Sequence, residues 1–188
     1  MSDLSRYAVF GLFDEATARR VRSLQHRLTE RTGNRTVLFF PVHVTIRGRF
    51  WARPCLAEEG FRRFRKSNSY DPGLIELTGP AFHAPDLVWL EIGAATHGFQ
   101  ELGRMHRDAN ETFRSVLEKD EVLPRYAGDG FFPHVTLGWG CAKENADELL
   151  VPSSLATIAG RLTSLALVRY PTVWPVNEDL DMIELANL

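Results

Sequence analysis

Two histidines occur in nearly the same short sequence, and they are the residues best suited to chemistry. His43-Val44-Thr45-Ile46 and His134-Val135-Thr136-Leu137 share the order His-Val-Thr-aliphatic, and a Phe-Phe-Pro tripeptide stands just before each. Apolar and β-branched residues of this kind favour a strand, in which alternate side chains point the same way. Each copy is therefore expected to present an imidazole and a hydroxyl on one face and two aliphatic side chains on the other.

A pair of imidazoles can move protons in both directions near neutral pH, because the unperturbed pKa of histidine is about 6.5. A neutral His43 or His134 can accept a proton from water or a hydroxyl, and a protonated one can donate to a leaving oxygen. Each well-placed transfer contributes about 10²- to 10⁴-fold in rate. The hydroxyls of Thr45 and Thr136 can donate to the oxygens of a bound anion. This set suits in-line attack at phosphorus without a metal or cofactor.

The repetition carries the functional argument, because a single histidine on a strand is more often a hydrogen-bonded structural residue. The order strand, helix, motif strand, helix, strand occurs twice, and the two histidines are 91 positions apart (134 − 43). An internal duplication explains this order, with approximate halves 1–85 and 86–188 in one α+β domain. Two related halves placed face to face bring His43 and His134 to opposite walls of one cleft.

Hydrophobic periodicity and turn residues place the remaining elements. Asp14 is a candidate N-cap for the first helix, and Gly33 a candidate C-cap. Strands are expected over 6–13, 43–51, 74–82, 86–93, 132–139, 162–170 and 182–185, and helices over 15–31, 54–66, 97–119 and 143–150.

Composition excludes several classes of protein. A formal net charge of −2 argues against coating of nucleic acid by charge alone, and 44% hydrophobic residues suffice for a sizeable core. Cys55 and Cys141 are too few for a disulfide framework or a zinc knuckle. Residues 1–13 lack the features of a signal peptide, and no apolar stretch is long enough to span a membrane. We expect a cytoplasmic protein, monomeric and without a membrane partner.

With these motifs the chain resembles the 2H phosphoesterase superfamily, in particular its 2′-5′ RNA ligase-like (LigT-like) branch. The resemblance covers the organisation of nearly the whole chain, and its specific content is the two His-x-Thr-aliphatic motifs. It implies a bilobal α+β fold in which two antiparallel sheets with flanking helices hold both motifs in a central groove. It further implies opening or hydrolysis of cyclic phosphates or 2′-5′ linkages, with His43 and His134 as an acid-base pair in either order and Thr45 and Thr136 as phosphate ligands.

The residues after each motif differ, which bears on the substrate. Strand alternation places Arg47 and Arg49 on the face of His43, whereas Gly138 and Gly140 occupy the equivalent places after His134. We expect Arg47 to contact a substrate phosphate, although pairing with a surface carboxylate explains it equally well.

Aromatic residues near the motifs are candidates for stacking a nucleobase, although aromatics in strands usually belong to the core. The candidates are Tyr7, Phe10, Trp51, Tyr126, Phe131 and Trp139. Tyr126 is the best of them, because it lies in a loop rich in Gly and Pro just before the second motif.

A run of seven cations between residues 47 and 66 is open to two interpretations. Arg62, Arg63, Arg65 and Lys66 could track an RNA backbone, or they could form the solvated face of a helix.

The preferred prediction is a phosphodiesterase acting on a 2′,3′-cyclic phosphate of RNA ends or small nucleotides. RNA ligation through the same residues and a non-catalytic nucleotide- or RNA-binding module are the alternatives. A metal site built on the two histidines lacks a third ligand at suitable spacing.

Overall fold

The computed structural model describes residues 4–67, 69–83, 85–121, 130–144, 157–171 and 180–188. Three α-helices, one 3₁₀ helix and nine strands lie within these ranges. In chain order they are β1 Ser5–Phe13, α1 Glu15–Thr32, η1 Thr36–Phe39, β2 His43–Ala52, α2 Pro54–Ser67, β3 Ile75–His83, β4 Leu87–Ile92, α3 His97–Arg114, β5 Lys119–Asp120, β6 His134–Gly138, β7 Ile158–Gly160, β8 Leu162–Tyr170 and β9 Asp181–Asn187.

The first helix begins and ends where its capping residues predict. The carboxylate of Asp14 accepts a hydrogen bond from the Thr17 backbone N–H at 2.9 Å, and another from the Arg161 N–H at 2.9 Å. Gly33 ends α1 in the left-handed conformation (φ 72°), and its N–H donates to the Thr29 carbonyl. Asp14 therefore caps α1 and also ties it to the start of β8.

The strands form two antiparallel sheets with the same internal plan. The five-stranded sheet has the order β5-β2-β1-β8-β9, and the four-stranded sheet has the order β6-β4-β3-β7. Each motif strand, β2 or β6, pairs with the strand that starts its repeat, β1 or β4. The α+β class with two antiparallel sheets is confirmed, but each sheet takes strands from both parts of the sequence, because β3 pairs with β4, and β8 pairs with β1.

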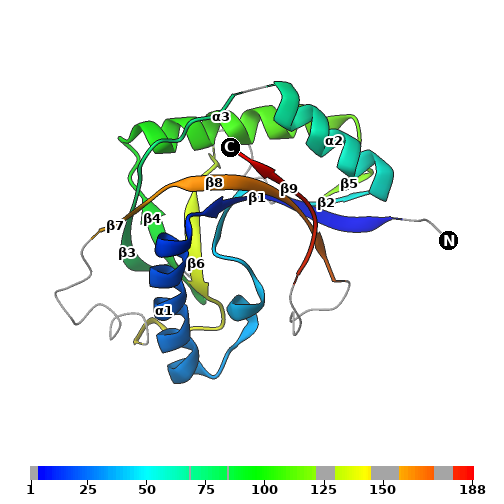
Figure 1. Ribbon diagram of the computed structural model, residues 1–188. Coiled ribbons are helices and arrows are strands. Elements are labelled where there is room, and N and C mark those ends of the chain that lie inside the picture. Colours follow the sequence, from blue (N-terminus) through cyan, green and yellow to red (C-terminus); the bar gives the residue numbers. More distant parts are fainter. Residues whose placement is uncertain (1–3, 68, 84, 122–129, 145–156, 172–179) are drawn as a thin grey trace.

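The helices are exchanged between the sheets (Figure 1). Helix α1 follows β1 in the chain but packs against β6 and β7 of the four-stranded sheet. Helix α3 follows β4 but packs against β2 of the five-stranded sheet, with α2 beside it. Each sheet is thus covered on one face by a helix that the other repeat supplies.

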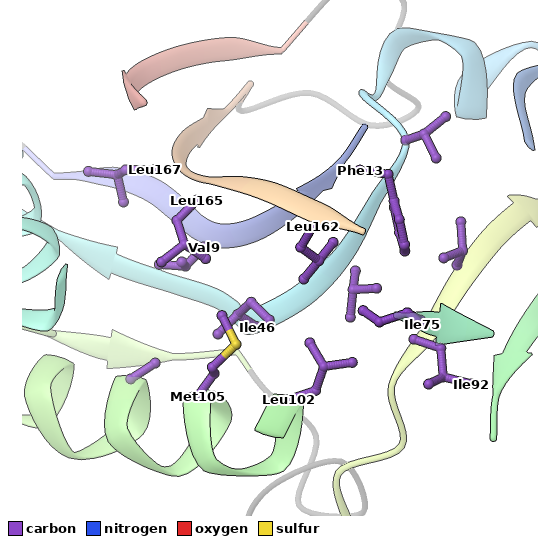
Figure 2. Close-up of a cluster of buried hydrophobic side chains, with 14 of the residues drawn as sticks. Val9, Phe13, Ile46, Ile75, Ile92, Leu102, Met105, Leu162, Leu165 and Leu167 are labelled. Atoms are coloured by element: carbon purple, nitrogen blue, oxygen red, sulfur yellow. The ribbon is translucent and has the colours of Figure 1, made fainter. Parts of the chain in front are cut away.

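The main core joins these layers. Figure 2 shows Leu102 and Met105 of α3 pointing toward Ile46 of β2, with Ile75 and Ile92 of the other sheet beyond them. All five side chains are fully or almost fully buried. Burial of side chains of this size contributes about 1.5–3 kcal/mol each relative to exposure. The aliphatic residues of the motif strands belong to this core, which leaves the opposite face of each sheet to the histidines.

Element boundaries differ from the sequence-based expectations in a few places. Helix α3 ends at Arg114 instead of continuing to 119, because Lys119–Asp120 pairs with β2 as the short edge strand β5. Strand β7 was not predicted, since three residues carry too little pattern. Most of the helix expected over 143–150 lies outside the described residues.

Candidate functional site

A cavity of about 540 Å³ separates the uncovered faces of the two sheets, and both motifs line it. His43 and Thr45 contribute from β2, and His134 and Thr136 from β6. The remaining described lining residues are mostly apolar or aromatic: Ala8, Phe40, Ile46, Gly48, Arg49, Leu87, Trp89, His106, Glu121, Phe131, Phe132, Pro133, Trp139 and Tyr170. The structure therefore brings together the four residues that the sequence singled out.

Both histidines are held by the same backbone hydrogen bond. The Nδ1 of His43 lies 2.8 Å from the Pro41 carbonyl oxygen, and the Nδ1 of His134 lies 2.8 Å from that of Phe132. A carbonyl only accepts, so Nδ1 carries the proton in each ring. The other ring nitrogen, Nε2, is left with a lone pair when the imidazole is neutral. Each ring can thus accept a proton through Nε2 or, once charged, donate one.

Each imidazole also packs against an aromatic ring of the neighbouring strand, stacked in the case of His43 and tilted by 35° in the case of His134. His43 lies on Phe10, with ring centroids 3.6 Å apart, and His134 lies on Trp89, with centroids 4.1 Å apart. Phe10 is the pairing partner of Thr45, and Trp89 is the pairing partner of Thr136. The same arrangement of histidine, threonine and cross-strand aromatic is therefore built twice, once in each wall.

A β-bulge follows the threonine in both copies. On β1 and β2 the pairing passes from Phe10↔Thr45 to Val9↔Arg47, which leaves Ile46 as the extra residue. On β4 and β6 it passes from Trp89↔Thr136 to Val88↔Gly138, and Leu137 is extra. A bulge bends its strand and reverses the alternation of side chains beyond it. The face shared by histidine and threonine therefore ends at the threonine.

Burial governs the protonation of both histidines. Burial lowers the pKa of His43 to about 4, opposed by its bond to Pro41 and assisted by charge on His134 and Arg22. Burial likewise lowers the pKa of His134, and His83 lowers it further. Both imidazoles are consequently neutral in the free protein at pH 7. The negative charge of a bound phosphate favours the protonated form and raises these pKa values.

A third histidine, His106 of α3, contacts residues of both motif segments. His106 of α3 is buried, and its Nδ1 lies 2.8 Å from the carbonyl oxygen of Ile46, the bulged residue of β2. Its Nε2 lies 2.8 Å from the Asn110 amide nitrogen, which fixes the tautomer. Its ring stacks on Phe131, just before the second motif, with centroids 4.1 Å apart and planes within 7°. The helical pattern around His106 indicates no such role, because a histidine near an apolar helix face is usually structural.

Arg47 was expected on the face of His43, in contact with a substrate phosphate, and this placement is wrong. Arg47 is only 2% exposed, does not line the cavity, and forms an ion pair with Asp120 at 2.5 Å. The bulge at Ile46 causes this, because it turns Arg47 to the core side of β2 and so cancels the alternation argument. Arg49 lines the cavity instead, because a second irregularity in the pairing, between Tyr7 and Val9 of β1, reverses the alternation again.

Gly138 of β6 was expected on the face of His134, but the bulge at Leu137 places it elsewhere. Gly138 does not line the cavity; a Cβ at this position would lie 2.7 Å from the Leu28 side chain of α1. This glycine lets the exchanged helix approach β6 closely.

The aromatic candidates divide between core and cavity. Tyr7 belongs to the core and Phe10 supports His43, whereas Phe131 and Trp139 line the cavity. Tyr126 lies outside the described residues. Trp89, Phe40, Phe132 and Tyr170 also line the cavity and were not predicted. The positions of Trp89 and Tyr170 follow from pairing between distant strands, which a single sequence does not reveal. Phe40 and Phe132 belong to the Phe-Phe-Pro tripeptides that precede the two motifs.

The basic residues of α2 lie away from the cavity. Phe61 and Phe64 anchor α2 in the same core as Val44 and Ile46, which is on the opposite side of β2 from His43. Arg62, Arg63, Arg65 and Lys66 are exposed, and Arg63 pairs with Glu59. This placement favours the solvated helix face over an RNA track entering the cavity.

The described residues contain neither a metal-binding cluster nor a membrane-spanning helix. Within the described ranges, no group of three or more His, Cys, Asp or Glu side chains is arranged to hold a metal ion. No helix in those ranges combines the length and apolar character needed to cross a bilayer.

Solved structures share this fold over nearly the full length of the chain. LigT of E. coli, crystallised with 3′-AMP, is 11% identical with a TM-score of 0.60, and the match covers 100% of this chain and 99% of LigT. LigT with NADP⁺ gives 9% identity, a TM-score of 0.61 and the same coverage. TT0787 of Thermus thermophilus is 18% identical with a TM-score of 0.61, over 97% of both chains.

No family model matches the sequence. No curated protein matches it significantly either. The LigT-like resemblance expected from the sequence is therefore confirmed at the level of the fold.

The contacts of His106 predict a measurable contribution to stability. His106→Leu leaves the buried carbonyl of Ile46 without its donor, which costs about 1–3 kcal/mol of unfolding free energy. Urea unfolding of this variant should show the loss, and Asn110→Leu should show a smaller one because only the outer partner is removed. His26→Leu, at an exposed position of α1, is the control. A His106→Leu variant as stable as the control contradicts the bridging role.

Proposed function

We propose that the protein is a metal-independent phosphodiesterase that hydrolyses a 2′,3′-cyclic phosphate, in RNA ends or small nucleotides, to a 2′-phosphate. The observation that carries this proposal is the duplicated unit of histidine, threonine and aromatic ring on two walls of one cavity. A single phosphoryl group between the walls has a proton acceptor on one side and a proton donor on the other. The fold shared with LigT, a protein that has been crystallised with nucleotides, supports the same assignment.

In the proposed reaction, His134 Nε2 accepts a proton from water as the water oxygen bonds to phosphorus. The bond from phosphorus to the 3′ oxygen breaks, and His43 Nε2–H donates its proton to that oxygen. Thr45 and Thr136 donate hydrogen bonds to the non-bridging oxygens, where negative charge grows. Ligation uses the same residues in the same roles, with a 5′-hydroxyl in place of water. His134 accepts the proton of that hydroxyl as its oxygen bonds to phosphorus, the bond to the 3′ oxygen breaks, and His43 protonates that oxygen, which leaves a 2′-5′ linkage.

The apolar lining has a chemical purpose in this proposal. Rings such as Trp139 and Phe132, the latter 37% exposed, offer flat surfaces against which a nucleobase can stack. An environment poor in water also strengthens the interaction of the threonine hydroxyls with the phosphate.

A substrate panel tests the proposal directly. The protein, in the presence of a chelator, is incubated with 2′,3′-cyclic nucleotides, RNA ending in a cyclic phosphate, and 2′-5′ dinucleotides, and the phosphorylated product is identified. We expect a 2′-phosphate. His43→Ala and His134→Ala should each lose at least about 10²- to 10⁴-fold in kcat, and Thr45→Val or Thr136→Val about 10²-fold.

Non-additivity makes the test sharper. Residues that act as a pair lose most of the rate when either is removed, so His43→Ala/His134→Ala should be little worse than the poorer single variant. His26→Ala, on the exposed face of α1, is the control and should keep full activity. Joining of cyclic-phosphate and 5′-hydroxyl ends favours the ligase, and nucleotide binding with no turnover on any substrate favours the binding module.

The buried state of the histidines predicts a specific pH dependence. Because the pKa values of both imidazoles lie below the usual 6.5, the protonated fraction of the acid is small at pH 7 and falls tenfold with each further unit. Since kcat/KM reports the free protein, it should fall between pH 6.5 and 8. The fall in kcat should begin at higher pH, since bound phosphate raises the pKa of the acid. A kcat/KM that rises over this interval contradicts the assignment.

A further inference from the structure

Arg49 is a cation that lines the cavity and has no role in the proposed reaction. Among the described lining residues only Arg49 and Glu121 carry a fixed charge. Arg49 lies on the same wall as Thr45, four positions further along β2, and Gly48 between them has no side chain to fill the space. Its guanidinium is therefore separate from the site of the reacting phosphoryl group but continuous with the same cavity.

The charges around Arg49 do not cancel. Glu121 lies 3.5 Å from Arg6 and 3.8 Å from Arg49, and its other oxygen accepts a hydrogen bond from the Trp51 indole at 2.6 Å. Burial alone would raise the pKa of Glu121, but the Trp51 bond and the two arginines hold it below its usual value. Two guanidinium groups therefore face one carboxylate that remains ionised, which leaves a net charge of +1 (2 − 1).

Arg49 is the member of this cluster that is free to bind a ligand. Arg6 is 13% exposed and donates to the Pro171 carbonyl, whereas the side chain of Arg49 is 42% exposed. At 3.8 Å, its contact with Glu121 is longer than a hydrogen bond, and within the described part of the chain its guanidinium donates no hydrogen bond. Its N–H groups are thus available to a ligand, and the planar geometry of the guanidinium matches that of a phosphate.

Tyr170 provides a second hydrogen-bond donor beside Arg49. Arg49 lies 5.9 Å from the centre of the Tyr170 ring, which also lines the cavity. A tyrosine hydroxyl has an ordinary pKa of about 10 and is protonated at neutral pH, so Tyr170 can donate to an anion; burial raises its pKa further.

We propose that Arg49, with Tyr170 beside it, forms a second anion subsite that selects ligands with a second phosphoryl group besides the one held between the two histidines. This inference rests on the proposed function for the position of the first phosphoryl group. The ligand class is a nucleotide phosphorylated at two positions, or an RNA end whose next internucleotide phosphodiester supplies the second charge. Glu121 limits the subsite to one added phosphate, because it neutralises the other arginine.

Equilibrium binding tests the subsite without requiring turnover. Calorimetry compares a nucleoside 2′-monophosphate, the corresponding 2′,5′-bisphosphate, and a dinucleotide ending in a 2′-phosphate, each with the wild-type protein, Arg49→Ala and Arg49→Lys. In the wild type we expect a second phosphate, of either kind, to tighten binding about tenfold. In Arg49→Ala the ratio should fall to about one, and in Arg49→Lys it should be partly restored because a point charge remains. Arg62→Ala, on exposed α2, is the matched control.

The outcomes separate this inference from the proposed function. Equal affinity for ligands with one and two phosphates in the wild type, or a preference that persists in Arg49→Ala, overturns the subsite even if cyclic phosphates are hydrolysed. A preference that depends on Arg49, in a protein that hydrolyses no member of the substrate panel, keeps the subsite and overturns the proposed function. Comparing the bisphosphate with the dinucleotide shows which kind of second phosphate gives the larger gain.

Discussion

The hydrogen bond from each catalytic candidate to the backbone carbonyl two residues earlier is the constraint on which the site depends. It joins His43 to Pro41 and His134 to Phe132, at 2.8 Å in both cases. Because the carbonyl can only accept, the bond fixes both the tautomer and the orientation of the ring. Aromatic rings then hold the imidazoles in place from the neighbouring strands. Without this bond, a desolvated imidazole could turn either nitrogen toward the ligand.

Two fixed rings are useful only if the walls that carry them keep their spacing. The exchange of helices provides this, since α1 covers the sheet of the second motif and α3 covers the sheet of the first. His106 adds a local connection, because it contacts the bulge after the first motif and the ring of Phe131 before the second. The main core runs through the same elements. The site is thus positioned by the packing that stabilises the fold.

Much of this arrangement was predictable from the sequence. The predictions that failed did so because they depend on how strands pair, which the sequence pattern does not reveal. The pairing of His43 with Thr45, and the class of fold, follow from local alternation and from the repeat. Arg47 was misplaced because a β-bulge adds a residue without any distinctive sequence pattern, and alternation assumes that none is present. Trp89 was missed because its position opposite Thr136 depends on the register between strands that lie far apart in the chain.

The central claim is that one phosphoryl group lies between two imidazoles that act on it from opposite sides. The most direct measurement is a crystal structure with a nucleoside vanadate complex, in which five-coordinate vanadium mimics phosphorus during in-line attack. We predict that Nε2 of His43 and of His134 each lie about 2.6–3.2 Å from oxygens on opposite sides of the vanadium, with the hydroxyls of Thr45 and Thr136 on the remaining oxygens. A vanadate bound by only one histidine, or bound outside the cavity, would contradict the account.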